Sequence, residues 1–155
     1  FGHRKTAAIH SKFIPALTGP EGKMSSSKPE TAIMLDDSPE EVEEKVKKHA
    51  YSGGGDTLKE HREQGADLSV DTSFQWLRNL LLEDDERMRE IAEKYSSGEM
   101  LTGEIKEILI EELNQFLEEH QTRKKNADDL VEKMMYEGDL AQEMWDRNID
   151  LKLER

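Results

Sequence analysis

Residues 102–126 read TGEIKEILIEELNQFLEEHQTRKKN and place apolar side chains at helical spacing along one stripe. We expect Thr102 to open the longest helical region of the chain, with the stripe continuing to residue 134. A stripe of this kind faces a hydrophobic core. The predicted core positions are Ile105, Ile108, Leu109, Leu113, Phe116, Leu117, His120, Ala127, Leu130, Val131 and Met134. The chain is therefore expected to be mainly α-helical.

A second helix is predicted from the capping residues Ser38-Pro39-Glu40-Glu41. Ser38 suits the N-cap, Pro39 suits the first helical position, and Glu41 completes a capping box. The helix should stop before the glycine run at residues 53–55. Its apolar face would carry Val42, Val46 and Ala50.

Shorter helices are expected between this one and Thr102. We expect Asp56 to cap a helix that Gly65 ends, Asp71 to cap the next one, and a further helix to span about 84–96. A short helix is also expected within 139–155. The predicted core residues of the middle helices are Phe74, Leu77, Leu81, Met88, Ile91, Ala92 and Tyr95.

Composition excludes several classes of protein. The 155 residues carry a formal net charge of −13, with 37% charged and 34% hydrophobic residues, and no apolar run approaches a membrane span. The sequence has no cysteine, and its five histidines lack ligand-like spacing, so we expect no disulfide and no structural metal. A cytoplasmic protein is expected. The acidic balance argues against indiscriminate nucleic-acid binding, while basic clusters at 45–49 and 123–125 leave a selective RNA partner possible.

A loop with a distinct chemistry precedes the helices. Lys23-Met24-Ser25-Ser26-Ser27 (KMSSS) lies between the turn residues 19–22 and Lys28-Pro29. A lysine ammonium, serine hydroxyls and successive backbone N–H groups can together hold phosphate oxygens. For the segment in isolation, a solvated Ser/Lys-rich loop is the better interpretation, because the flanking Gly and Pro mark a loop whatever its role.

The order of several blocks closely resembles tryptophanyl-tRNA synthetases of the archaeal and eukaryotic type. These blocks are HSKFIPAL (10–17), KMSSS, KHAYSGGGDT (48–57), EHREQG (60–65), DTSF (71–74), YSSGEMLTGEIK (95–106) and HQTR (120–123), and the resemblance weakens after about residue 137. It implies that 1–36 is the C-terminal piece of a class I Rossmann catalytic domain. Residues 37–155 would be the helical anticodon-binding domain with a C-terminal tail.

The resemblance also implies a nucleotide site. KMSSS corresponds to the family's KMSKS loop, so Lys23, Met24, Ser25, Ser26 and Ser27 would bind the phosphates of ATP, accompanied by Mg²⁺. Of these, Lys23 and the three serines would be the catalytic residues, which stabilise charge in the transition state. Ser26 replaces the usual second lysine, which leaves the main phosphate contact to Lys23. The role of that second lysine would be weaker here, shared with Mg²⁺, or partly supplied by Lys28. The family's HIGH-type signature and tryptophan pocket do not occur in these residues, so we expect no tryptophan-dependent ATP/pyrophosphate exchange by this chain alone.

Residues for tRNA are implied as well. Asp56 and Lys106 match positions that the family uses at the CCA anticodon. Arg62 and Arg123 are either further phosphate contacts or ordinary surface arginines. A carboxylate can accept a hydrogen bond from cytosine N4, and a lysine can meet a base oxygen or a phosphate. Asp56 could instead be only a helix cap, and Lys106 only an exposed helix lysine. Gly55 stands where some relatives carry a larger basic residue, whose contact would be absent here.

The expected function is that of the C-terminal part of a tryptophan–tRNA ligase. The parent enzyme would activate tryptophan with ATP and transfer it to tRNA(Trp), would bind tryptophan through its N-terminal part, and would be a homodimer. Alternatives are the C-terminal region of a tyrosyl-tRNA synthetase, a stand-alone tRNA-binding module without catalysis, and a purely structural helical bundle.

Overall fold

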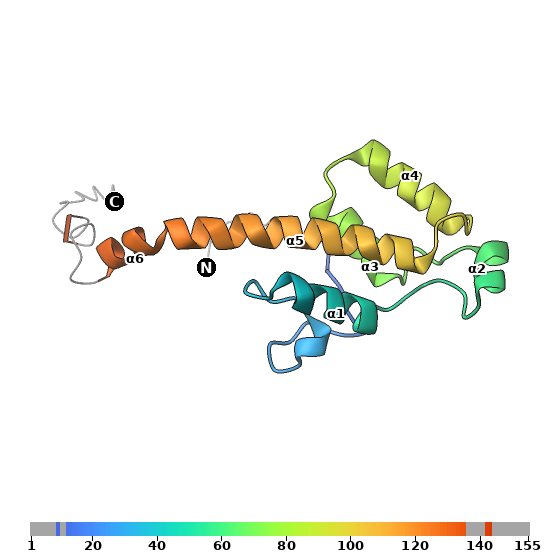
Figure 1. Cartoon of the computed structure of the whole chain (residues 1–155), viewed down its shortest axis with the longest axis horizontal. Coiled ribbons are helices and arrows are strands. Elements are labelled where there is room, and N and C mark those ends of the chain that lie inside the picture. The colour runs from blue at the N-terminus through green and yellow to red at the C-terminus, as the bar shows by residue number, and fades with distance from the viewer. Residues whose placement is uncertain (1–8, 10–11, 136–141, 144–155) are drawn as a thin grey trace, which may run out of the picture. The chain divides into compact units, whose positions relative to one another are not determined.

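A computed structural model describes Ile9, residues 12–135 and residues 142–143 (Figure 1). The chain forms two compact units, one ending at Leu117 and the other beginning at Glu118. The helices are α1 (Pro39–His49), α2 (Leu58–Gln64), α3 (Thr72–Trp76), α4 (Asp85–Ser96), α5 (Thr102–Asn126) and α6 (Asp128–Met134), with a 3-10 turn η1 (Pro29–Thr31) and a π-helical turn η2 (Leu77–Leu81). The prediction of a mainly helical chain is confirmed for the described residues.

The core of the first unit surrounds the first half of α5, with α1 and α4 on either side of it (Figure 1). Along α5 the buried positions repeat every fourth residue, which is the spacing of one helix face. The principal buried side chains are Leu17, Val42, Val46, Phe74, Trp76, Leu77, Met88, Ile91, Tyr95, Ile105, Leu109, Leu113 and Leu117. These assignments confirm most of the predicted apolar positions. Leu77 and Leu81 lie in η2, and Leu81 and Ala92 are only partly buried against the core.

The predicted stripe was wrong in its breadth and its length. Phe116 is 42% exposed, and Leu130, Val131 and Met134 are 49–58% exposed. Leu117 is the last described residue of the buried core, and the first compact unit ends at the same residue. The expected helix within 139–155 lies outside the described residues, apart from 142–143.

Helix starts follow local capping chemistry. Ser38 caps α1 through a capping box with Glu41, and Asp71 caps α3 by accepting the Phe74 N–H at 2.9 Å, as predicted. The prediction that Asp56 caps α2 was wrong. Thr57 is the N-cap and forms a capping box with Glu60, and the helix ends at Gly65 as expected.

Residues 12–37 contain no β-strand among those described, only η1 and isolated bridges within two tight turns. Backbone hydrogen bonds tie this segment to the helices. The Leu17 N–H donates to the Thr31 carbonyl at 2.8 Å, the Tyr51 N–H donates to the Leu17 carbonyl at 3.0 Å, and the Thr72 N–H donates to the Tyr51 carbonyl at 3.1 Å. The expected domain boundary at 36/37 therefore falls inside one compact unit, and as a boundary between ancestral domains it stays a prediction.

Candidate functional site

The KMSSS loop is a tight turn closed at its base by a threonine. The Lys28 N–H donates to the Ser25 carbonyl at 3.1 Å. The Thr31 hydroxyl accepts the Ser25 N–H at 3.0 Å and donates to the Lys28 carbonyl at 2.7 Å. Thr31 is only 8% exposed, so these bonds are shielded from water. The turn therefore has a defined shape without any strand on either side of it.

The tip of this turn presents polar groups to solvent. Lys23, Ser26, Ser27 and Lys28 are exposed, whereas Ser25 is half-buried with its hydroxyl oxygen 2.9 Å from that of Ser27. The structure thus places the predicted phosphate-binding side chains together on one loop. Hydroxyls and ammonium groups at a tight turn suit an anionic ligand.

A second candidate loop, residues 53–56, is pressed against the helices. The Gly53 N–H donates to Asp71 Oδ2 at 2.9 Å, and the Gly54 N–H donates to the Ser52 hydroxyl at 3.0 Å. A Cβ on Gly53 would lie 2.2 Å from the Asp67 carbonyl oxygen, and one on Gly54 would lie 2.5 Å from His61 Nδ1. Glycine is required here because the backbone approaches its neighbours too closely for any side chain.

A buried polar network lies beneath this loop. The Tyr95 hydroxyl donates to Asp71 Oδ2 at 2.7 Å and lies 3.3 Å from the Thr102 hydroxyl, which in turn lies 3.0 Å from that of Ser52. Tyr95 and Asp71 are 0% and 1% exposed. Burial, followed by the charge of Asp71, raises the pKa of Tyr95 far above its usual range, so its hydroxyl stays protonated and donates.

A histidine at the centre of α2 completes the support. His61 is 3% exposed, its Nε2 lies 2.8 Å from the Met100 carbonyl oxygen, and its ring centroid lies 5.6 Å from that of Tyr95. The sequence alone did not predict a role for His61 or for the pairing of Asp71 with Tyr95. These contacts join residues far apart in the chain, and the only local signals were the cap at Asp71 and the apolar position of Tyr95.

Of the predicted anticodon residues, Asp56 is the last residue of this loop and Lys106 lies on α5. Asp56 is exposed and is separated from Gly53 and Gly54 by Gly55. Lys106 lies one turn after Thr102 on α5 and is half-buried, with its ammonium donating to the Lys47 carbonyl at 3.2 Å. Burial lowers the pKa of Lys106, and the charge of Asp71 opposes that shift. The segment from Lys47 to Gly54 therefore runs along the face of α5 that carries Thr102 and Lys106.

The two predicted arginines differ in their surroundings. The Arg62 guanidinium donates to the Gly98 carbonyl at 2.8 Å and also to the Glu99 carbonyl, so it joins α2 to the loop after α4. Arg123 belongs to the second unit and is exposed, 3.5 Å from Glu119 on the same helix. Arg62 thus binds backbone carbonyl groups and joins α2 to the loop after α4, while Arg123 forms an exposed ion pair with Glu119 on its own helix.

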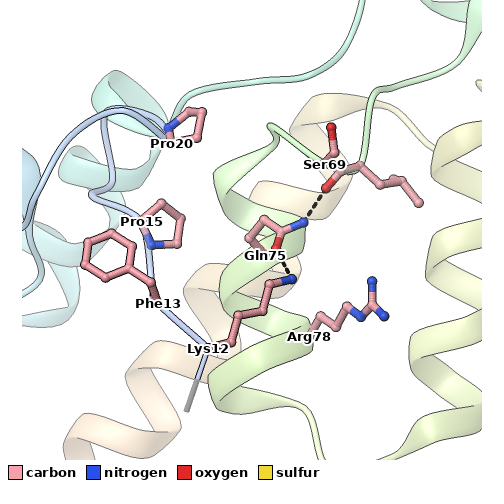
Figure 2. Close-up of a pocket in the computed structure, with 8 residues that line it drawn as sticks. Lys12, Phe13, Pro15, Pro20, Ser69, Gln75 and Arg78 are labelled. Atoms are coloured by element: carbon pink, nitrogen blue, oxygen red, sulfur yellow. Dashed lines mark hydrogen bonds between the residues drawn. The ribbon is translucent and has the colours of Figure 1, made fainter. Parts of the chain in front are cut away.

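A cavity of about 400 Å³ lies between the N-terminal segment and α3 (Figure 2). Its wall is held by Gln75, whose Oε1 accepts from Lys12 at 3.3 Å and whose Nε2 donates to the Leu68 carbonyl at 2.6 Å. The lining residues are Lys12, Phe13, Pro15, Pro20, Leu68, Ser69, Gln75 and Arg78. None of the predicted site residues lines it, so this cavity is separate from both candidate loops.

Across the described part of the chain, no group of three or more His, Asp or Glu side chains is placed to hold a metal ion. No helix in that part combines the length and apolar character needed to cross a membrane.

Comparison with known proteins gives consistent matches. Residues 1–118 match the family described as class I tRNA synthetases (W and Y). The tryptophan–tRNA ligase of Saccharolobus solfataricus is 56% identical over 146 residues, 94% of this chain and 38% of that protein. The tryptophan–tRNA ligase of Pyrococcus horikoshii is 51% identical over 154 residues, 99% of this chain and 40% of that protein.

Solved structures agree with these sequences. The tryptophanyl-tRNA synthetase from Giardia lamblia superposes with a TM-score of 0.73 at 43% identity, covering 76% of this chain and 29% of that one. The tryptophanyl-tRNA synthetase of the archaeon Aeropyrum pernix K1 gives 0.70 at 36% identity, covering 75% and 31%. The chain spans about two fifths of the length of the curated relatives it matches.

Proposed function

Because this chain belongs to the class I tRNA synthetases for tryptophan and tyrosine, we propose that it is the C-terminal part of a tryptophan–tRNA ligase. In this proposal the helical domain, residues 37–155, binds the CCA anticodon of tRNA(Trp), and the KMSSS loop binds the phosphates of ATP. The matched relatives are tryptophan–tRNA ligases at 51–56% identity, which supports tryptophan over tyrosine.

The anticodon assignment is supported above all by the positions of Asp56 and Lys106. Asp56 ends the 53–56 loop, and Lys106 lies on the face of α5 beside it. Asp56 offers an exposed carboxylate with no helix to cap, since Thr57 takes that role. A carboxylate of this kind can accept from the N4 amino group of an unpaired cytosine. Lys106 lies on the helix face against which the loop is held, and one of its three donors is used by the Lys47 carbonyl. Its remaining donors are suited to a base oxygen or a phosphate.

The nucleotide assignment is supported by the chemistry of the KMSSS turn. Residues 23–28 contain two lysines, three serines and no carboxylate, so the turn is suited to phosphate rather than to a bare cation. In this proposal ATP is the substrate and Mg²⁺ is its counter-ion, which would neutralise phosphate charge. Lys23 would stabilise the charge of the departing pyrophosphate, and Lys28 would share that contact because Ser26 has no ammonium group.

Binding to short RNA hairpins tests the anticodon assignment. We expect the chain to bind a hairpin with CCA in its loop more tightly than one whose middle base is changed. Asp56→Ala should reduce this ratio about tenfold, since one good base contact supplies about that discrimination. Asp36→Ala is the matched control, because it removes an exposed carboxylate away from the loop. Equal binding of both hairpins by the unsubstituted chain would remove the assignment.

The same assay separates the alternatives. A hairpin with the tyrosine anticodon GUA that binds more tightly than CCA would favour a tyrosyl-tRNA synthetase, and binding of neither would favour a structural bundle. A homodimeric, cytoplasmic parent that binds tryptophan through its N-terminal part stays a prediction of the family resemblance.

A further inference from the structure

The Asp71 carboxylate does more than cap a helix. Its Oδ1 accepts the Phe74 N–H at 2.9 Å, which is all that the N-cap of α3 requires. Its Oδ2 accepts two further hydrogen bonds, from the Gly53 N–H at 2.9 Å and from the Tyr95 hydroxyl at 2.7 Å. Asp71 therefore joins the start of α3, the end of α4 and the loop that leads to Asp56.

Of the residues that hold the 53–56 loop, Tyr95 is the one buried most completely. It lies near the end of α4, is fully buried, and makes no contact with solvent. Its hydroxyl fixes Asp71 Oδ2 on one side and lies 3.3 Å from the Thr102 hydroxyl on the other. Without the tyrosine hydroxyl, Oδ2 would keep only the Gly53 N–H, and the network would lose its link to Thr102 and Ser52.

The loop has little freedom once this network is formed. Consecutive N–H groups at Gly53 and Gly54 both donate inward, to Asp71 and Ser52. On the far side of Asp56, the capping box between Thr57 and Glu60 fixes the start of α2. Asp56 is thus an exposed side chain between two fixed segments. A binding group that is held in place before its ligand arrives loses less conformational entropy on binding.

We propose that Asp71 and Tyr95 are positioning residues for the anticodon: their hydrogen bond holds the 53–56 loop in the shape that presents Asp56 to the unpaired CCA bases. Neither side chain is exposed enough to touch RNA, so both act through the loop. This inference rests on the proposed function. It concerns residues that do not contact the RNA bases themselves.

The test uses Tyr95→Phe, which removes one oxygen and keeps the buried ring. We expect the ratio of CCA to altered-hairpin affinity to fall about tenfold, the factor expected for losing one hydrogen bond to a charged group. The amide protons of Gly53 and Gly54 should exchange with solvent faster by a similar factor. Tyr51→Phe is the matched control, because Tyr51 is 47% exposed and contributes only backbone groups to the hydrogen bonds described above.

Asp71→Asn provides a second variant if Tyr95→Phe folds poorly. Asparagine keeps the N-cap acceptor and removes the charged Oδ2. We expect it to reduce the same affinity ratio while α3 stays folded.

The outcomes separate the two proposals. Suppose that the unsubstituted chain prefers CCA, that Asp56→Ala removes this preference, and that Tyr95→Phe and Asp71→Asn both retain it. The positioning role is then refuted, while the anticodon assignment stands. If the unsubstituted chain has no preference, both proposals fail.

Discussion

Replacing Thr31 by valine should loosen the KMSSS turn without unfolding the chain. The substitution keeps the shape of the side chain, which is 8% exposed, and removes the hydroxyl that accepts the Ser25 N–H and donates to the Lys28 carbonyl. Each of these hydrogen bonds contributes about 1 kcal/mol net, so opening of the turn should become easier by about 2 kcal/mol. That corresponds to roughly a 30-fold rise in the population of the open turn.

Hydrogen exchange of the Ser25 amide, followed by NMR, measures this opening directly. We expect its exchange rate in Thr31→Val to rise by about the same 30-fold, with α1 and α5 amides much less affected. Thr31→Ser is the matched control, because it keeps the hydroxyl and removes only a methyl group. If the Ser25 amide exchanges equally fast in Thr31→Val and in the unsubstituted chain, the hydroxyl does not hold the turn and the reasoning fails.

Three further outcomes are expected from the fold. Gly65→Ala should lower the free energy of unfolding, measured by urea titration, by at least about 2 kcal/mol. The backbone φ at Gly65 is +69°, and a Cβ there would lie 1.7 Å from the Ser96 carbonyl oxygen. A smaller loss of stability would contradict that clash. Leu109→Ala should cost about 2–5 kcal/mol by the same measurement, whereas Phe116→Ala on the exposed side of α5 should cost far less, and equal costs would contradict the assigned face. Burial raises the pKa of Tyr95 in the folded chain. Below about pH 10 the tyrosine is protonated in both the folded and the unfolded chain, so pH does not affect stability through this group. Above about pH 10 only the unfolded chain releases the proton, so the free energy of unfolding should fall as pH rises. Urea titrations at pH 9 and pH 11 should show a larger difference for the unsubstituted chain than for Tyr95→Phe, and identical differences would refute this origin.

Local signals predicted the helices well because capping is a short-range effect. Asp71 was identified as a cap from four neighbouring residues and is confirmed. Asp56 was the wrong choice because Thr57 is followed three residues later by Glu60, and that reciprocal pair is the stronger signal. The same rule, applied one residue along, would have predicted the observed start.

Longer-range features were not readable in this way. Apolar spacing predicts that a residue faces some core, and it cannot tell where the core ends, so Phe116 and Leu130 were wrongly included. The bond between Tyr95 and Asp71 joins positions 24 residues apart and exists only after folding. The residues proposed to contact RNA came from the family resemblance, while those that hold the loop came from the structure.

The backbone hydrogen bonds through Leu17 bear on how this protein can be divided. Starting the chain at residue 37 would leave the Tyr51 N–H without its acceptor and would take the fully buried Leu17 out of the core. Losing a fully buried leucine side chain from a core costs about 2–5 kcal/mol. The helical domain 37–155 is therefore not an independent folding unit that begins at α1. A protein made to contain this domain alone must also include residues 12–36.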